Sequence, residues 1–204
     1  MAELDTDSIT QAALTVADRD GREGFTMRAV AQQLGVTSAA LYRHVADKRD
    51  LISLVVDAIV VERPLPTPTG DWREDLWQMA NAMRAMSHAH PAVAELRRGH
   101  QIWSATVLPL TERWMNLWNQ SGLPLELALR GAVATSLAIT GIVDEELMLR
   151  SMKRPDEAAL TWVPNARAAF HLERDAHADF ELVVRSMIDG VHARLVAEHQ
   201  RVTA

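Results

Sequence analysis

The segment from Thr26 to Lys48 gathers side chains that can bind phosphate groups and base edges. Hydroxyl, guanidinium, imidazole and ammonium groups donate hydrogen bonds to phosphate oxygens, and short side chains beside them can approach base pairs in a major groove. The residues that we expect to contact DNA are Thr26, Arg28, Thr37, Ser38, Ala39, Tyr42, Arg43, His44 and Lys48. Their spacing predicts one outer surface built on short helices.

Two short helical patterns position these residues. Thr26 can cap a helix with an apolar stripe, and Gly35 suits the left-handed conformation that ends a helix. Thr37 can then cap a second helix of about two turns, in which Ala40 and Leu41 face the first helix. This order is typical of a helix-turn-helix, whose second helix enters the major groove of double-stranded DNA.

The nine residues divide by the part of the DNA that they can reach. Thr37, Ser38 and Ala39 start the second helix, where side chains meet base edges, and Arg43 can reach a guanine or a phosphate. The other five residues are assigned to the phosphate backbone. This division predicts which substitutions change sequence preference and which change overall affinity.

The flanking segments complete the expected N-terminal domain. A helix capped by Asp5 or Asp7, followed by a turn over residues 18–24, precedes the two short helices. Asp47 can cap a further helix over residues 48–63, which must end at the proline-rich residues 64–70. We therefore expect a DNA-binding domain over residues 1–50, a linking helix over residues 48–63 and a second domain over residues 64–204.

Residues 9–59 resemble the N-terminal domain of the tetracycline-repressor (TetR) family of bacterial regulators. The resemblance is close over about a quarter of the chain and lies in the segments Gly24–Arg28, Val30–Ala31, Leu34–Val36, Ala39–Val45 and Lys48–Leu51. The rest of the chain is similar to the family only in its helical layout and length. The resemblance implies a homodimer on a palindromic operator, a helical effector-binding domain and a four-helix bundle at the dimer interface.

Composition limits the alternatives. The chain has 204 residues, 48% of them hydrophobic, and no cysteine, so we exclude disulfides and expect a reducing cytoplasm. The net charge of −6 is unlike a uniformly basic nucleic-acid binder, but the segment Phe25–Arg49 holds four basic residues against one acidic residue. Uncharged runs such as residues 131–143 are too short to span a bilayer, so no membrane partner is expected.

The second domain is also expected to be helical, which makes the fold class all-α: a helix-turn-helix domain followed by a larger ligand-binding and dimerisation domain. Its apolar periodicity predicts helices over residues 71–87, 91–98, 101–120, 125–149, 156–160 and 176–199. Pro109 is expected to kink the third of these helices, and an irregular piece is expected around Pro164.

Five of the six tryptophans lie between Trp72 and Trp118, together with several methionines. Rigid aromatic rings beside adaptable thioethers suit a cavity for apolar molecules. The residues expected to line it are Trp77, Asn81, Met83, Met86, Trp103, Val107, Trp114, Met115 and Trp118. A plain core of bulky side chains is the alternative for each single residue.

Two apolar stripes indicate a homodimer. One lies in the helix expected over residues 125–149 and the other in the last helix, and two-fold reading of DNA half-sites requires such an interface. The interface residues that we expect are Leu129, Val133, Leu137, Phe180, Val184, Met187 and Val191. The alternative is that both stripes only fill the core of one protomer.

No cofactor, metal site or enzymatic motif is expected. His88, His90 and His100 lie close in sequence, but no carboxylate stands at ligand spacing, and Asp144, Glu145 and Glu146 diverge around a helix. Glu-x-x-His pairs, a P-loop and nucleophile motifs do not occur, which makes a helical-bundle enzyme the weakest class.

We therefore expect a transcription regulator, a repressor that a small apolar or amphipathic effector releases from its operator. The alternative is a helix-turn-helix regulator controlled by a protein partner, which a closed and solid middle region would favour.

Overall fold

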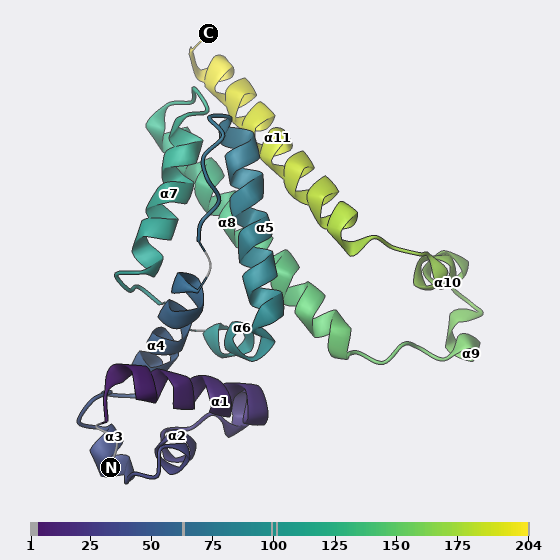
Figure 1. Ribbon diagram of the computed structural model, residues 1–204. Helices are drawn as coiled ribbons and strands as arrows, with labels where there is room; N and C mark the ends of the chain where they lie inside the picture. Colours follow the sequence, from purple (N-terminus) through teal and green to yellow (C-terminus); the bar gives the residue numbers. More distant parts are fainter. Residues whose placement is uncertain (1–3, 63, 99, 101, 204) are drawn as a thin grey trace.

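The computed structural model describes residues 4–62, 64–98, 100 and 102–203, and these ranges contain helices and no β-strand (Figure 1). Two hydrophobic cores lie at opposite ends of the molecule. One core includes the N-terminal helices, and the other is built from the long helices that lead to the C-terminus. The expected all-α class is confirmed.

Three helices form the N-terminal end. α1 (Thr6–Gly24) begins with a capping box between Asp5 and Ser8, α2 (Met27–Gln33) follows the cap Thr26, and α3 (Ser38–Leu41) follows the cap Thr37. The turn expected over residues 18–24 is instead a kink inside α1 at Gly21, whose φ of 61° interrupts the helix at one residue. Glycine accepts this left-handed conformation without steric cost.

α4 (Lys48–Val61) is the expected linking helix. The Asp47 carboxylate caps it by accepting hydrogen bonds from the N–H groups of Arg49 and Asp50. Its apolar side, which includes Leu51 and Val55, is buried in the N-terminal core. Residue 63, the expected end of this helix, lies outside the described residues.

α6 (Pro91–Arg97) returns to the N-terminal core from beyond the proline-rich segment. Val93 and Leu96 of α6, and Ile102 after it, are buried in the same cluster as residues of α1, α2 and α4. A domain border at residues 64–70 remains our proposal. It does not divide the two cores completely, because α6 and Ile102 lie in the N-terminal core. The sequence after such a border contributes to the core before it.

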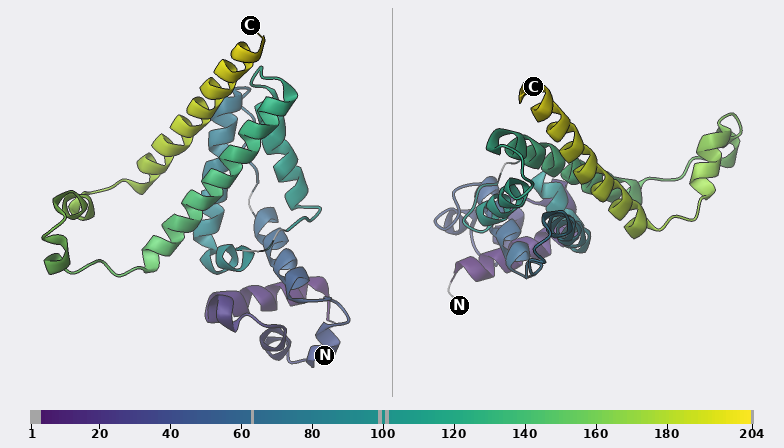
Figure 2. Two further views of the ribbon diagram at one scale, coloured as in Figure 1. Left: turned by 180° about the vertical axis from the view of Figure 1, so that it is seen from behind. Right: turned by 90° about the horizontal axis from the view of Figure 1, so that it is seen from above.

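The second core is formed by α5 (Trp72–Ala89), α7 (Val107–Asn119), α8 (Leu125–Ser151) and α11 (Ala176–Thr203). α8 packs against α5, α7 and α11, which places it at the centre of this half (Figures 1 and 2). Between α8 and α11, the chain leaves the body as an arm that carries α9 (Glu157–Leu160) and α10 (Pro164–His171). Trp162 in this arm is 87% exposed.

Two expectations about prolines are wrong for a common reason. α7 starts at Val107 instead of residue 101, so Pro109 lies in its first turn, where the missing N–H has no helical acceptor and no kink is required. Pro164 is the first residue of α10, a position that suits its fixed φ, so the irregular piece is helical.

Candidate nucleic-acid interface and apolar faces

Side-chain caps fix the start of both short helices. The Thr26 hydroxyl accepts from the N–H of Ala29 at 3.1 Å, and the Thr37 hydroxyl accepts from the N–H of Ala40 at 3.2 Å. Each cap uses only a lone pair of the oxygen, so the hydroxyl hydrogen remains available to donate. A phosphate oxygen is an acceptor of the kind that these two threonines can bind.

The turn between α2 and α3 depends on Gly35. Its φ of 70° lets the chain reverse, and the N–H of Val36 then donates to the carbonyl of Ala31 at 3.0 Å. This is the left-handed helix end that the sequence predicts at Gly35. The expected helix-turn-helix geometry is therefore confirmed at its turn.

Two buried residues anchor the second helix. Leu41 is 0% exposed and Val45 is 3% exposed, and residues four apart lie on one side of a helix. α3 itself is one turn, Ser38–Leu41, shorter than the expected two turns, and the chain continues in hydrogen-bonded turns to Val45, whose N–H donates to the carbonyl of Leu41 at 3.1 Å. Tyr42, Arg43 and His44 are exposed on the remaining sides, with 52% of Tyr42 accessible.

The nine residues expected to contact DNA lie at the surface of α2, α3 and the first turn of α4. All are exposed except Ser38 and Lys48, which are partly buried. The Lys48 ammonium lies 5.7 Å from the centre of the ring of Phe25, the residue that precedes the cap of α2. Within the described part of the chain, Arg28 and Arg43 form no ion pair, so both guanidinium groups are available to an anion. Their contact with DNA remains a prediction.

Trp114 and Trp118 belong to the core between α7 and α8. Trp118 is 0% exposed and Trp114 is 8% exposed, and their indole N–H groups donate to the Thr135 hydroxyl at 3.2 Å and to the Ala132 carbonyl at 2.9 Å. A buried indole whose N–H has a protein partner is a stable core residue. For these two residues the structure supports the plain-core alternative.

Gly131 allows this close packing. A β-carbon added at Gly131 would lie 2.6 Å from the Trp118 ring, which is shorter than any normal contact. Gly131 therefore lets the indole approach the backbone of α8.

The remaining residues of the expected cavity do not surround one space. Trp77, Met83 and Met115 pack in the C-terminal core, whereas Met86 and Val107 pack against the N-terminal core. Trp103 is 57% exposed, and Asn81 is partly buried on α5. The nine residues therefore do not line one chamber, which corrects our expectation. The sequence could not show this, because α5 is long enough to reach both cores and composition does not show the direction of each side chain.

The structure places a hollow of about 420 Å³ elsewhere, between α8 and α11. Its walls are partly apolar and partly charged, and the lining residues are Ala138, Gly141, Ile142, Glu145, Glu146, Leu149, Arg174, Asp179, Phe180 and Val183. An amphipathic molecule could contact Phe180 and Ile142 with its apolar part and the charged groups with its polar part.

A polar cluster supports one wall of this hollow. Glu146 of α8 pairs with the Arg84 Nε at 2.7 Å and with the His88 Nε2 at 3.0 Å, so it ties α8 to α5. Burial lowers the pKa of His88 below its usual value, the nearby cations of Arg150 and Arg84 lower it further, and Glu146 opposes them. His88 therefore favours its neutral form in the folded protein.

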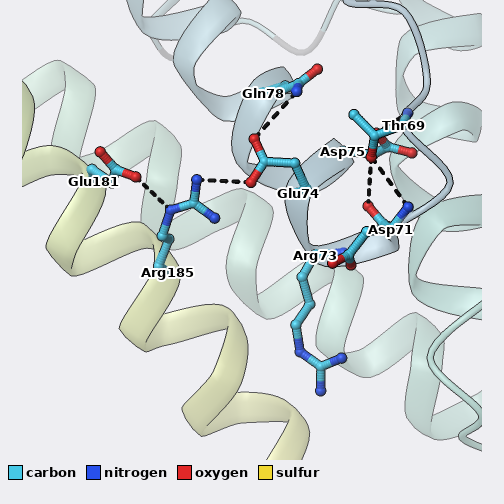
Figure 3. Close-up of polar contacts among 8 residues, drawn as sticks. All are labelled: Thr69, Asp71, Arg73, Glu74, Asp75, Gln78, Glu181 and Arg185. Carbon is cyan, nitrogen blue, oxygen red and sulfur yellow. Dashed lines mark hydrogen bonds and ion pairs between the residues drawn. The ribbon is translucent and has the colours of Figure 1, made fainter.

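A second polar network joins the start of α5 to α11 (Figure 3). The Arg185 guanidinium lies between Glu74 and Glu181, at 2.8 Å and 2.7 Å. The N–H and the hydroxyl of Thr69 both donate to the Asp75 carboxylate at 2.7 Å. Burial raises the pKa of Asp75, but these hydrogen bonds outweigh it and leave the pKa below its usual value.

α8 and α11 expose large apolar side chains away from the core. Leu129, Val133 and Leu137 of α8 are 36%, 46% and 70% exposed, and Leu182 of α11 is 67% exposed. By length and composition alone α8 could cross a membrane, although it packs against α5, α6, α7 and α11 and a third of its apolar window is buried. An exposed apolar face on a helix held in a core indicates a protein partner.

The expected interface residues of α11 require a correction. Phe180 and Val184 are only 2% and 0% exposed because they fill the core of their own protomer, and Met187 and Val191 pack partly against that core. Because apolar residues occur on both sides of α11, the sequence could not show which side of this helix is buried and which is exposed. The exposed side carries Leu182 instead.

Sequence reasoning missed the polar contacts between helices. Asp144 of α8 lies beside Arg98, whose Nη2 donates to the Asp144 carbonyl at 2.9 Å, and Asp57 of α4 accepts from the Ser104 hydroxyl at 2.5 Å. Their positions are 46 and 47 residues apart, and no local pattern marks such pairs. A single carboxylate followed much later by an arginine or serine carries no signal in one sequence.

Two family descriptions match separate parts of the chain. Residues 9–55 match the bacterial regulatory proteins of the tetR family, and residues 64–195 match the tetracyclin repressor-like C-terminal domain. The first match covers the helix-turn-helix, and the second covers α5 to most of α11.

Characterised relatives agree with this division. The chain is 28% identical over 200 residues to the class E tetracycline repressor protein of Escherichia coli, across 96% of this chain and 94% of the repressor. It is 33% identical over 124 residues to the HTH-type transcriptional repressor DrrR1 of Streptomyces coeruleorubidus. That match covers 59% of this chain and less than half of DrrR1, 45% of its length.

Solved structures show the same architecture. Apo ActR from Streptomyces coelicolor superimposes with a TM-score of 0.76 at 29% identity, across 97% of this chain and 99% of ActR. ActR in complex with actinorhodin gives a TM-score of 0.76 across 95% of this chain and 99% of that protein. With both of its regions matched and its helix-turn-helix in place, the chain belongs to the TetR family of bacterial transcriptional regulators.

Proposed function

We propose that this protein is a cytoplasmic, homodimeric repressor that binds a palindromic operator through α3 and is released by a small amphipathic effector. The observation that carries the proposal is the surface of α2 and α3, where buried Leu41 and Val45 hold exposed donors and unpaired cations outward. The helix-turn-helix uses such a surface to bind a major groove. Repression is the function printed for the relatives DrrR1 and class E tetracycline repressor.

Dimerisation is supported by the exposed apolar side of α8 and α11. Leu137 and Leu182 are each about two-thirds exposed in the single chain, and a second copy would remove them from water. A two-fold axis repeats one surface on both copies, so the same residues meet across the interface. It also places the two recognition helices in successive major grooves, roughly 34–36 Å apart.

Effector binding is supported by the hollow between α8 and α11. Its mixed lining suits a molecule with an apolar body and polar substituents, and the similar protein ActR has been solved with actinorhodin bound. The hollow is lined by residues of α8 and α11, the same two helices whose exposed apolar sides form the proposed dimer interface.

The proposed mechanism is a population shift. Effector binding favours a conformation in which α4 swings, so that the two copies of α3 no longer match successive major grooves. α4 is suited to this role because its apolar side is buried in the N-terminal core while it leads directly to the proline-rich segment. Inducer should therefore change the spin-label distance between the two recognition helices, and an unchanged distance would contradict the mechanism.

The test begins with selection of double-stranded DNA by the purified dimer. Fluorescence anisotropy with the recovered duplex then measures release by two named probes, actinorhodin and minocycline, the second being the ligand of a solved structure with the same fold. We expect at least one amphipathic probe to stabilise the protein thermally and release the duplex. Recovery of no sequence at low salt would contradict the DNA-binding proposal.

Substitutions at Gly141 test the hollow itself. A β-carbon at Gly141 meets nothing within 4 Å, so Gly141→Ala is a matched control that should keep effector release. Gly141→Phe should fill the hollow and abolish release while leaving DNA binding intact. Equal release by both variants would place the effector elsewhere.

A second candidate is a regulator controlled by a protein partner. The packed positions of Trp114 and Trp118, which make the middle region solid, favour it. This alternative predicts that the dimer binds its selected duplex and that no small amphipathic probe shifts its thermal stability.

A further inference from the structure

A serine before α7 bonds to the side of α4. The Ser104 hydroxyl donates to the Asp57 carboxylate of α4 at 2.5 Å and accepts from the Val107 N–H at 3.0 Å. Val107 is the first residue of α7, so one hydroxyl group joins the side of α4 to the start of α7. A hydroxyl has a single hydrogen and spare lone pairs, which matches this use of one donor and one acceptor.

A second polar contact holds α4 from another side. Glu62, which follows the last turn of α4, lies 3.0 Å from the His90 Nε2 at the corner between α5 and α6. Asp57 and Glu62 are five residues apart, which places them about 140° apart around a helix axis. The C-terminal half of α4 is therefore held by two contacts that point in different directions.

α7 also contacts the segment that follows α4. The Arg113 guanidinium donates to the carbonyl of Pro66, so α7 is bonded both to the side of α4 and to the chain beyond it. At the same time Trp114, Leu117 and Trp118 fix α7 to the C-terminal core. A shift of α7 within that core must either carry α4 with it or break the contact between Ser104 and Asp57.

We propose that Ser104 and Asp57 form a polar latch that sets the orientation of α4 and hence of the DNA-binding domain. The latch rests on the proposed function, because its role is to transmit the effector signal to α4. With the latch closed, α4 has one orientation relative to α7. With the latch open, the contact between Glu62 and His90 remains as a pivot about which α4 turns.

Spin labels within one chain measure the latch without DNA, effector or knowledge of the dimer. The chain has no cysteine, so two engineered cysteines are the only labelling sites. Gln32→Cys on α2 and Asn119→Cys at the end of α7 are exposed positions in the two halves. Mixing labelled chains with an excess of unlabelled chains leaves one labelled pair per particle.

Ser104→Ala and Asp57→Ala should each broaden or shift the distance distribution between these labels. The double variant should differ from the labelled parent no more than either single variant, because both remove the same contact. Ser104→Thr keeps the hydroxyl and should keep the distribution of the parent. Ser53→Ala is the matched control, since among the described residues the Ser53 hydroxyl bonds the Arg49 carbonyl of its own helix, at 3.1 Å, and no group of another helix.

An unchanged distribution in both Ser104→Ala and Asp57→Ala overturns the latch. Should Ser104→Ala unfold, Asp57→Ala decides alone, and an unchanged distribution in that variant overturns the latch. A change in Ser53→Ala equal to that in Ser104→Ala would also contradict the proposal.

Failure of the latch and failure of the proposed function give different results. If the labelled parent shows one narrow distance that the variants broaden, yet selection recovers no DNA, the latch stands and the repressor proposal fails. If the duplex is bound and released by a probe while every variant keeps the parent distribution, the repressor proposal stands and another contact transmits the signal.

Discussion

Two surfaces of this protein are exposed in opposite ways. On α2 and α3, polar and charged side chains point outward from the buried anchors Leu41 and Val45. On α8, the outward side chains are Leu129, Val133 and Leu137, while the inward side packs against Trp118 and its neighbours. The first surface is hydrated in the free protein. Covering the second surface with another apolar surface removes it from water and lowers the free energy.

This difference separates the two kinds of partner. A polyanion is bound by donors and cations that remain hydrated until the complex forms, so its site can be exposed in the free protein. A second protein chain is bound mainly by apolar area, at roughly 25 cal/mol per Å² of buried surface. The two surfaces therefore predict DNA at one end of the molecule and a second copy of the chain along α8 and α11.

The largest expected effect comes from a charge on the apolar face. Leu137→Glu should convert the proposed dimer to monomers, because an unpaired carboxylate would be buried in its interface. Loss of two-site binding should weaken the complex with a palindromic duplex by about 10²–10⁴-fold. Sedimentation velocity and fluorescence anisotropy measure the two losses.

Leu108→Glu is the matched control for that experiment. Leu108 is 49% exposed but lies on α7, outside the face formed by α8 and α11. The Leu108→Glu variant should remain dimeric. A monomeric Leu108→Glu variant would show that the loss of dimers is not specific to the face formed by α8 and α11.

The two sides of α8 can be compared through its glycines. Gly131→Ala places a β-carbon against the buried Trp118 ring and should destabilise the protein by about 1–3 kcal/mol in urea unfolding. Gly141→Ala meets no atom within 4 Å and should be neutral or stabilising by up to about 1 kcal/mol. Equal effects of the two changes would contradict the packing of Trp118 on α8.

The prediction that the polar surface binds DNA is tested further by comparing base contacts with phosphate contacts. Arg43→Ala should cost about 1–3 kcal/mol of binding and relax sequence preference, if Arg43 reaches a base. Lys48→Ala and Tyr42→Ala should weaken binding to all duplexes alike, and the lysine variant should lower the salt slope by about 1.

Titration of binding against salt, on the selected duplex and on random DNA, distinguishes these outcomes. Arg201→Ala, a loss of the same charge near the end of α11, is the control and should leave both measurements unchanged. Identical losses on both duplexes from Arg43→Ala and Lys48→Ala would remove the division between base and phosphate contacts.

The smallest expected effect is a dependence of stability on pH at the cluster beside the hollow. Because the folded protein holds the pKa of His88 below its unfolded value, the unfolded chain takes up the proton first as the pH falls. The contribution of His88 to stability is complete above the unfolded pKa of about 6.5 and is lost as the pH falls toward the lowered folded pKa. In His88→Gln, the midpoint of thermal unfolding should therefore depend less on pH between about pH 7.5 and 5.5.

Thermal melts of the two proteins across that range test this assignment. A parent midpoint that falls on acidification just as steeply as that of His88→Gln would show that another group titrates there.

Several features of the fold were set by local sequence. Thr26, Thr37 and Asp47 cap helices because their side-chain oxygens reach N–H groups two or three residues ahead, and Gly35 ends α2 because it accepts a positive φ. Such interactions involve neighbours in the chain, so they can be read from one sequence. The same holds for the apolar periodicity that located most of the helices.

Other features depended on long-range packing. The sequence placed tryptophans and methionines in one region, but only the structure showed that Trp118 is buried against Gly131 and that Met86 belongs to the other core. It also could not tell which side of α11 is buried, because Phe180 and Leu182 occur in one apolar helix and differ only in direction.

The sequence by itself determined most of the helices, the caps Thr26, Thr37 and Asp47, the turn at Gly35 and the outward residues that follow Thr37, because these follow from contacts within a few positions. Only the tertiary structure decided that α6 closes the N-terminal core, that the hollow lies between α8 and α11, and that Ser104 meets Asp57. These features bring together residues that are far apart in the chain, and their meeting depends on how whole helices pack.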